Sequence, residues 1–266
     1  MSGGLAVFTL WQRELVRFFR QPSRVAGAAG SPLLFWVLIG SGLSGSFRLP
    51  GGPGVGAGGG GISYLEYFFP GTLVLVVLFA AIFSTISVIE DRNQGFLQGV
   101  LAAPVSRAAI AGGKVLGGAT LAWLQGAVFL LLAPLSGIHL TVASALAAAG
   151  VLAALSFALT ALGFACAWKV ESVQGFHAVM NLLLVPMWLL SGSFFPLSGA
   201  PVWLQALMRA NPLTYGVALL RHAFYGDAPV LRGGLPGPAV SLAVSLVLAA
   251  LAFGLALRVT RGGRVE

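Results

Sequence analysis

The sequence predicts an all-α protein that crosses a membrane several times, and three observations support this fold class. Of its 266 residues, 58% are hydrophobic and only 8% are charged, whereas a soluble globular domain carries about 25% charged residues. The mean hydropathy is +0.93, and uncharged apolar runs long enough to cross a bilayer recur along the chain. These runs do not alternate apolar and polar residues with a period of two, which argues against an outer-membrane barrel.

Composition also excludes several classes of function. The net charge of +8 does not indicate nucleic-acid binding, because the 15 Lys and Arg residues stand singly between apolar runs and form no basic face. The single cysteine, Cys166, excludes a disulfide framework and a cysteine-based zinc site.

Residues 1–24 are expected to form an amphipathic helix that lies in the cytoplasmic membrane interface. Its apolar stripe is Phe8, Trp11, Leu15 and Phe18, and its cationic stripe is Arg13, Arg17, Arg20 and Arg24. We expect the arginines of this interfacial helix to lie among anionic headgroups. The alternative is a simple anchor that follows the positive-inside rule.

Six segments are expected to cross the membrane. They are residues 25–47, 68–89, 111–138, 140–168, 172–197 and 235–257. A cleaved signal peptide fits the first segment less well, because 24 residues precede it. With a cytoplasmic N-terminus, eleven Lys and Arg fall inside and four outside, so the positive-inside rule predicts that both termini are cytoplasmic.

The first two connections differ in kind. Eight of the eleven residues in 51–61 are glycine, which predicts a flexible external loop. Residues 90–104 instead begin with charged residues, and Phe96, Leu97, Val100 and Leu101 then form an apolar ridge at helical spacing. We expect a short cytoplasmic surface helix, capped by Asp91 or Asn93, whose exposed ridge docks a partner. The alternative is an ordinary short loop.

The segment after Pro104 predicts how the next helix starts, and it contains no nucleotide site. Ser106 is expected to cap the helix that follows. Gly113-Lys114-Val115 fails the P-loop pattern, because valine stands where Ser or Thr must hold the metal. The chain therefore shows no means of its own to hydrolyse a nucleotide.

The long segment 198–234 predicts two short helices that dip back toward the membrane. Trp203, Leu204 and Met208 belong to one apolar stripe. Asn211-Pro212 then signals a new helix start, with Asn as the cap and Pro in the first turn. Such non-spanning pieces are stable only where protein or water satisfies their backbone.

Three parts of the chain together resemble the permease subunits of type-2 ABC exporters, the ABC-2 family. The first part is the interfacial helix with Trp11, Arg13, Glu14 and Arg20. The second, which resembles the family's coupling helix, contains Glu90, Asp91, Arg92, Gly95, Phe96, Leu97, Val100 and Leu101. The third, which resembles its C-terminal signature, contains Pro196, Asn211, Pro212, Leu213, Tyr215 and Arg221.

The resemblance implies that residues 1–266 form one transmembrane domain that is half of a transporter. A second permease chain, expected as a homodimer, would pair with it, and two copies of a separate ATP-binding cassette subunit would bind ATP and magnesium. This chain would then hold no cofactor, no metal and no catalytic residue. The resemblance also implies a bacterial inner membrane and export of a hydrophobic or amphipathic substrate such as a drug or lipid; a polysaccharide or lipid-linked glycan is the alternative.

Polar residues inside the predicted spans give one further candidate. Gln174, His177 and Asn181 lie on one face of the fifth span and would line the pathway or the dimer interface; interhelical hydrogen bonding is the alternative. A secondary transporter remains the rival from another class, but it would need a buried carboxylate in mid-span, and none is present. An intramembrane serine protease would need a serine and a histidine deep in facing helices, and His177 is the only histidine well inside a predicted span.

Overall fold

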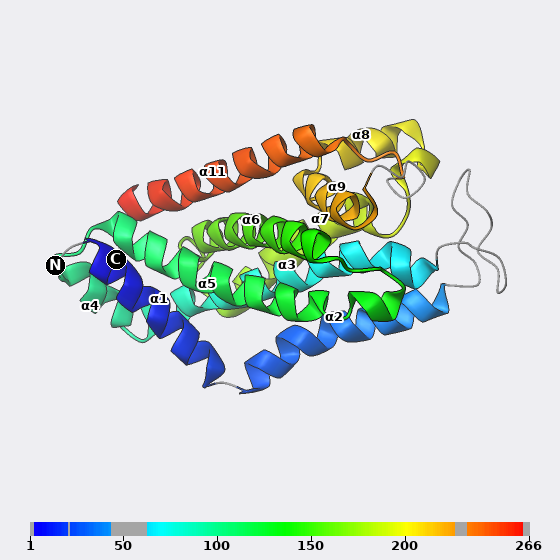
Figure 1. The fold of residues 1–266 in the computed structure, drawn as a ribbon. Coiled ribbons are helices and arrows are strands. Elements are labelled where there is room, and N and C mark those ends of the chain that lie inside the picture. The colour runs from blue at the N-terminus through cyan, green and yellow to red at the C-terminus, as the bar shows by residue number, and fades with distance from the viewer. Residues whose placement is uncertain (1–2, 21, 44–62, 227–232, 263–266) are drawn as a thin grey trace.

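The computed structural model describes residues 3–20, 22–43, 63–226 and 233–262, which form an elongated helical bundle (Figure 1). These ranges contain no strand, which confirms the all-α fold class. The helices are α1 (Gly3–Phe19), α2 (Pro22–Gly42), α3 (Tyr64–Asn93), α4 (Phe96–Ala102), α5 (Arg107–Leu130), η1 (Ala133–Ser136), α6 (Val142–Ala167), α7 (Val173–Trp188), η2 (Leu189–Ser193), η3 (Leu197–Gly199), α8 (Val202–Ala210), α9 (Pro212–Tyr225) and α11 (Pro238–Gly262).

Helix α3 is the central helix of the bundle. Helices α2, α5, α6, α7 and α9 pack around it, and nearly every side chain from Tyr67 to Ile89 is buried. A helix that is apolar on all sides must be enclosed in this way. Ser63 caps its start by accepting a hydrogen bond from the Glu66 amide at 3.1 Å.

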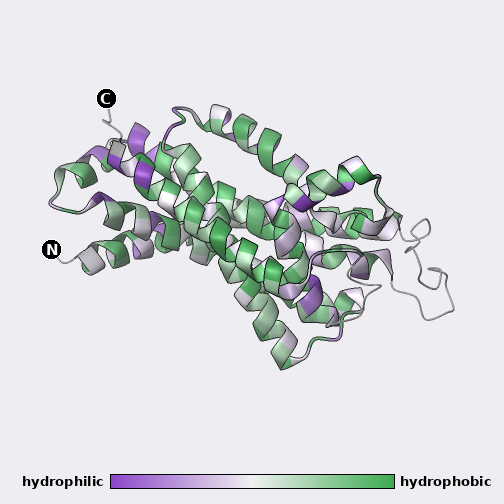
Figure 2. Cartoon of the chain, turned by 90° about the horizontal axis from the view of Figure 1, so that it is seen from above, coloured by the Kyte–Doolittle hydropathy of each residue, from purple (hydrophilic) through white to green (hydrophobic). Residues whose placement is uncertain are grey.

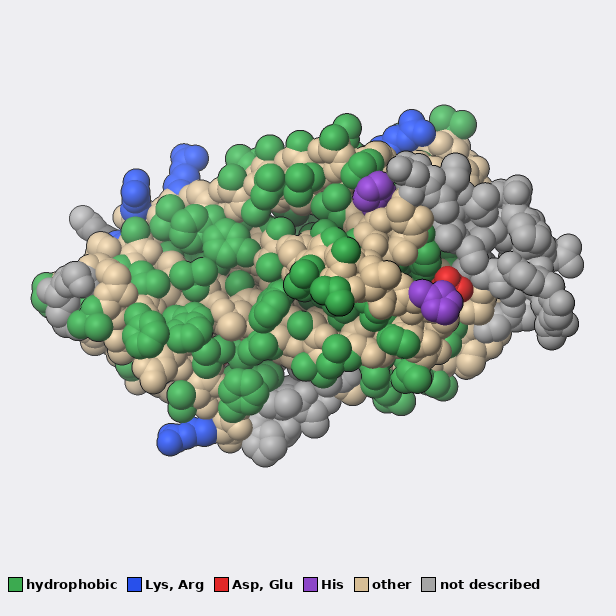
Figure 3. All heavy atoms as spheres, in the orientation of Figure 1, with side chains coloured by type: hydrophobic (Ala, Val, Ile, Leu, Met, Phe, Trp, Pro, Cys, Tyr) green, Lys and Arg blue, Asp and Glu red, His purple; other side chains and the backbone are tan. Residues whose placement is uncertain are grey.

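Four helices of the described chain are long and apolar enough to cross a membrane: α3, α6, α7 with the turn that follows it, and α11. Helix α5 has 24 residues but includes Arg107 and Lys114, and α2 has 21 residues. Six spans would require α2 and α5 as well, so that number stays a prediction. Figure 2 shows hydrophobic residues along the middle of the bundle, and Figure 3 shows Lys and Arg at the margins of a largely apolar face.

Three predicted spans stop earlier in the structure than the sequence predicts. Helix α5 begins at Arg107 and stops at Leu130, before a 3-10 turn that contains Pro134, a residue that cannot continue a helical ladder. Helix α7 gives way at Trp188 to a π-helical turn, within which Gly192 adopts φ 83°. Helix α2 ends at Gly42, and residues 44–62, which include the glycine-rich loop, lie outside the described residues.

The two short helices predicted in 198–234 are present as α8 and α9. Asn211 caps α9, since its side chain accepts from the Leu213 amide at 3.1 Å, and Pro212 occupies the first turn. Helix α9 packs against α6 and α11 and continues to Tyr225, slightly beyond the predicted end near Arg221. Neighbouring helices therefore enclose this non-spanning piece, as its backbone requires.

Helix α1 begins and α11 ends at the same end of the bundle, where α4 also lies (Figure 1). We call this the α4 end and the opposite end the α8 end. Helix α1 packs directly on α5 because Gly113 and Gly117 leave room for it. A Cβ atom at Gly113 would lie 2.7 Å from Cβ of Leu10, and one at Gly117 would lie 2.7 Å from Cβ of Glu14.

Candidate functional site

Six charged side chains form a connected cluster at the α4 end, where α1, α3 and α5 meet. Three are cations and three are anions, so their formal charges cancel. They are Arg13, Glu14 and Arg17 of α1, Glu90 and Asp91 of α3, and Lys114 of α5. We call this set the charged cluster.

Asp91 is the centre of the charged cluster and is fully buried. Arg13 donates to both of its carboxylate oxygens at 2.8 Å, and Arg17 donates to Oδ1 at 2.7 Å. Lys114 Nζ also donates to Oδ2 of Asp91. Buried carboxylates need such charge-assisted partners, because a lone charge in a low-dielectric site is strongly unfavourable. The prediction that Asp91 or Asn93 caps the short surface helix is wrong, since both belong to the last turns of α3.

Three further ion pairs belong to the charged cluster. Arg13 pairs with Glu14 at 3.3 Å, and Arg17 pairs with Glu90 at 2.7 Å. Lys114 is 5% exposed and donates to Glu14 at 2.6 Å. Burial acts to lower the pKa of the Arg13 guanidinium, but the hydrogen bond to Asp91 and the charges of Asp91 and Glu14 outweigh it and leave that pKa raised. Arg13 therefore keeps its positive charge, and α1 is held on both α3 and α5.

The charged cluster corrects the expected orientation of the interfacial helix. Arg13 and Arg17 face protein carboxylates rather than headgroups, whereas Arg20 is exposed. The side chain of Arg24 lies outside the described part of the chain. Trp11 donates to the Thr120 hydroxyl at 3.1 Å. The outward face of α1 instead exposes the apolar Leu5, Phe8, Val16 and Phe19, together with the polar Thr9 and Gln12.

The short helix α4 is tied to the charged cluster. Gly95 turns the chain after α3 with φ 75°, which favours glycine, and α4 begins at Phe96. The Arg13 guanidinium lies 3.6 Å from the centre of the Phe96 ring. The predicted exposed ridge is wrong for Leu97, which is 1% exposed, while Phe96, Val100 and Leu101 are half-buried. The exposed surface of α4 is formed by Gln98, Gly99 and Ala102.

Two arginines outside the charged cluster bind the carboxyl ends of other helices. Arg92 donates to the carbonyl oxygen of Ala167, the last residue of α6, at 3.3 Å. It also donates to the carbonyl oxygen of Val170, just beyond α6, at 3.1 Å. Arg107 donates to the Thr260 carbonyl oxygen near the end of α11 at 2.9 Å. Cations satisfy the unpaired carbonyls there and oppose the negative end of the helix dipole. Ser106 caps α5 as expected, accepting from the Ala109 amide at 3.2 Å.

At the α8 end, the signature residues surround the irregular turn η2. Arg221 is fully buried, donates to the Gly192 carbonyl oxygen at 2.8 Å and lies 4.0 Å from the centre of the Tyr67 ring. Tyr67 donates to the same carbonyl at 3.2 Å. Pro196 and Leu213 are buried, and Tyr215 donates to the Arg209 carbonyl oxygen at 2.8 Å. These contacts stabilise a break in helical structure.

The polar stripe of the fifth predicted span lies on the outer part of α7. Gln174 and Asn181 are exposed, and His177 is half-buried with its ring centre 5.7 Å from that of Phe83. The opposite face of α7 is buried and consists of Phe176, Met180, Leu184 and Trp188. The stripe is therefore available to a partner, and the predicted role in a pathway or dimer interface stays a prediction.

Lys114 is the member of the charged cluster to which the sequence assigned no role, and Glu14 was noted only as part of the family resemblance. Each was visible as an anomaly: an acid in a basic helix, and one lysine beside glycines at the start of a predicted span. A buried ionisable group in a membrane protein needs a partner. The sequence therefore contains the signal that Glu14 and Lys114 pair with each other.

Comparisons with known proteins find similar sequences along most of this chain. The family model for the ABC-2 type transporter matches residues 6–225. Nodulation protein J of Rhizobium leguminosarum bv. viciae is 27% identical over 230 residues, covering 85% of each chain. The inner membrane transport permease YadH of Escherichia coli K12 is 26% identical over 240 residues, covering 85% of this chain and 86% of its own.

Proposed function

The chain belongs to the ABC-2 type transporter family, a membrane component of ABC transporters, and on that premise we propose that it is the permease subunit of an ATP-driven exporter. The observation that carries the proposal is the family match across residues 6–225, which includes the interfacial helix, α4 and the signature residues. Membership in this family also excludes the alternative that the chain is a secondary transporter. Energy would come from ATP and magnesium bound by a separate ATP-binding cassette subunit, two copies of which would dock at the α4 end.

Helix α4 is suited to pass force from such a subunit into the bundle. Its buried Leu97 anchors it to the core, and Phe96 lies beneath Arg13. Because Arg13 also binds Asp91, a push on α4 acts on α1 and α3 together, and Lys114 extends the connection to α5. ATP binding would then favour one conformation by its differential interaction with the two states.

A second copy of the chain would complete the transporter. The exposed positions of Gln174 and Asn181 on α7 support this face as pathway or dimer interface, since polar groups in a span normally face protein or water rather than lipid. The short connections between α4 and α5 and between α6 and α7, without a soluble insertion, support a hydrophobic or amphipathic substrate. The name of the Escherichia coli relative supports an inner-membrane location. Helix α1 begins and α11 ends at the same end of the bundle, which supports two termini on one side of the membrane. We propose that this side is the cytoplasmic one.

The test is co-purification of this chain with the ATP-binding cassette subunit encoded beside its gene, followed by ATP hydrolysis in liposomes. We expect a stable complex whose hydrolysis depends on this chain. Absence of a complex and of ATP dependence would contradict the proposal.

Coupling is tested in the same complex with Phe96→Ala. This change should preserve assembly and basal hydrolysis but uncouple hydrolysis from transport. Leu131→Ala, an exposed apolar position near the α8 end, is the matched control and should leave coupling unchanged. If ATP hydrolysis stays coupled to transport to the same degree in both variants, α4 does not pass force from the ATPase subunit.

A further inference from the structure

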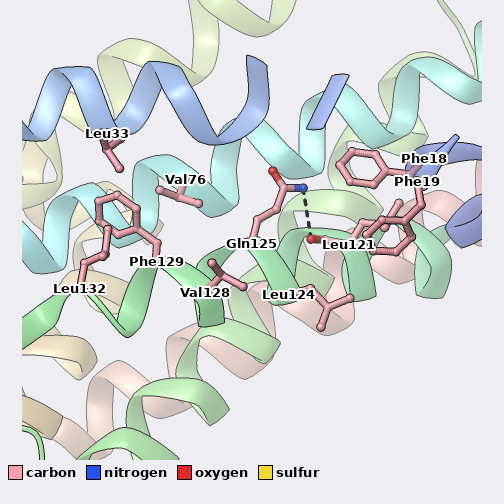
Figure 4. Close-up of a pocket in the computed structure, with 10 residues that line it drawn as sticks. All are labelled: Phe18, Phe19, Leu33, Val76, Leu121, Leu124, Gln125, Val128, Phe129 and Leu132. Atoms are coloured by element: carbon pink, nitrogen blue, oxygen red, sulfur yellow. Dashed lines mark hydrogen bonds between the residues drawn. The ribbon is translucent and has the colours of Figure 1, made fainter. Parts of the chain in front are cut away.

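An apolar groove runs along α5, beneath α2 and beside α3. Its volume is about 490 Å³, within the range of small-molecule sites. Figure 4 shows Phe18 and Phe19 of α1 at one end and Leu132 at the other. The lining residues on α5 and just beyond it extend from Leu121 to Leu132, a length of about 16 Å at the helical rise per residue. The groove is therefore long and narrow enough for an extended apolar chain.

Gln125 is the one polar side chain among the described residues that line the groove. Its Nε2 donates to the Leu121 carbonyl oxygen at 3.2 Å. Its Oε1 is buried and has no hydrogen-bond partner in the described part of the chain. Figure 4 shows this oxygen turned away from α5 toward the space below α2. Buried acceptors are rarely left unpaired in proteins, so the groove presents an acceptor without its donor.

We propose that this groove binds a lipophile from the bilayer that combines an extended apolar chain with one hydrogen-bond donor, such as a long-chain alcohol or amide. The apolar walls select the chain, and Oε1 of Gln125 selects the donor. A small rotation about the last bond of the Gln125 side chain brings Oε1 to the donor, because that torsion is soft. The site goes beyond the proposed function, since it requires neither the ATPase subunit nor transport.

The bilayer is the source that the position of the groove favours. Leu121 to Leu132 lie inside the predicted third span, residues 111–138, so the open side of the groove faces the predicted hydrocarbon region. Val128, which lines the groove, is 66% exposed. A ligand therefore reaches the site sideways from the membrane.

The experiment uses the purified full chain in nanodiscs and two photoreactive probes. One is an aliphatic diazirine with a terminal hydroxyl, and the other carries a methoxy group in its place. Peptide mass spectrometry of the labelled protein measures saturation at residues 121–132. We expect the hydroxyl probe to label this segment at about tenfold lower concentration than the methoxy probe, the usual effect of one hydrogen bond.

Two variants make the result specific. Gln125→Leu should keep labelling but abolish the preference for the hydroxyl probe. Val128→Trp should fill the groove and reduce labelling by both probes. Leu131→Trp is the control, because it adds the same side chain at a 75% exposed position that does not line the groove. This control should leave labelling by both probes unchanged.

Three outcomes would overturn the site. They are equal labelling by both probes in the unmodified chain, a hydroxyl preference that survives Gln125→Leu, and no labelling of residues 121–132 by either probe.

Discussion

Replacing Asp91 by asparagine tests whether the charged cluster holds the α4 end together. The variant keeps the shape of the side chain but leaves three cations, Arg13, Arg17 and Lys114, facing two anions. Breaking a buried ion pair from one side costs about 3 to 5 kcal/mol. At roughly 2 to 4 °C per kcal/mol for a chain of this size, the Tm should fall by about 6 to 20 °C. Thermal unfolding in detergent, followed by tryptophan fluorescence, measures the shift.

Two further variants separate charge balance from general damage. Glu90→Gln removes a carboxylate whose side chain is 25% exposed, so it should cost only about 1 kcal/mol. Lys114→Met added to Asp91→Asn restores equal numbers of cations and anions and should recover part of the lost stability. The reasoning is refuted if Asp91→Asn is no more damaging than Glu90→Gln, or if Lys114→Met adds its own full cost to that of Asp91→Asn.

Three other changes test local features of the structure by their effect on Tm. Gly192→Ala should destabilise by about 1 to 2 kcal/mol because of its positive φ, whereas Gly254→Ala, which has open space around it, should be neutral or stabilising. Equal effects would contradict the assigned strain. Asn211→Ala should lower the stability by about 1 kcal/mol through loss of the cap on α9. Asn211→Ser should keep most of the stability that the cap provides. Gly117→Ala should cost about 1 to 3 kcal/mol by pushing α1 from α5; an unchanged Tm would show that α1 is not held there.

The sequence predicted the helices better than their ends. The all-α class, the caps at Ser106 and Asn211 and the two short helices of 198–234 follow from composition, periodicity and turn chemistry. The end of α5 was missed because apolar composition continues through the 3-10 turn, and hydropathy alone does not record the change of backbone geometry. The break at Gly192 was missed for the same reason, because several glycines occur in apolar runs of this chain and only the fold shows which one takes a positive φ.

The charged cluster shows why partners were harder to predict than helices. Asp91 was named as a candidate site residue, but its partners Arg13 and Lys114 lie 78 and 23 residues away in the sequence. A stripe of arginines on an amphipathic helix is typical of a membrane surface. It pairs with protein here because α1 folds back over α3 and α5.

This reversal has a consequence for how α1 meets the membrane. With Arg13 and Arg17 committed to carboxylates, the outward face of α1 presents Phe8 and Phe19, which are 54% and 61% exposed. Interfacial binding would then depend on apolar burial more than on attraction to anionic headgroups. The same two arginines connect α1 to α3, and Arg13 also contacts Phe96 of α4, so a motion of α4 alone must break the contact between Arg13 and Phe96. Breaking that cation–π contact costs about 0.5 to 2 kcal/mol. Movement of α1, α3 and α4 together keeps both this contact and the ion pairs, and is therefore the favoured course.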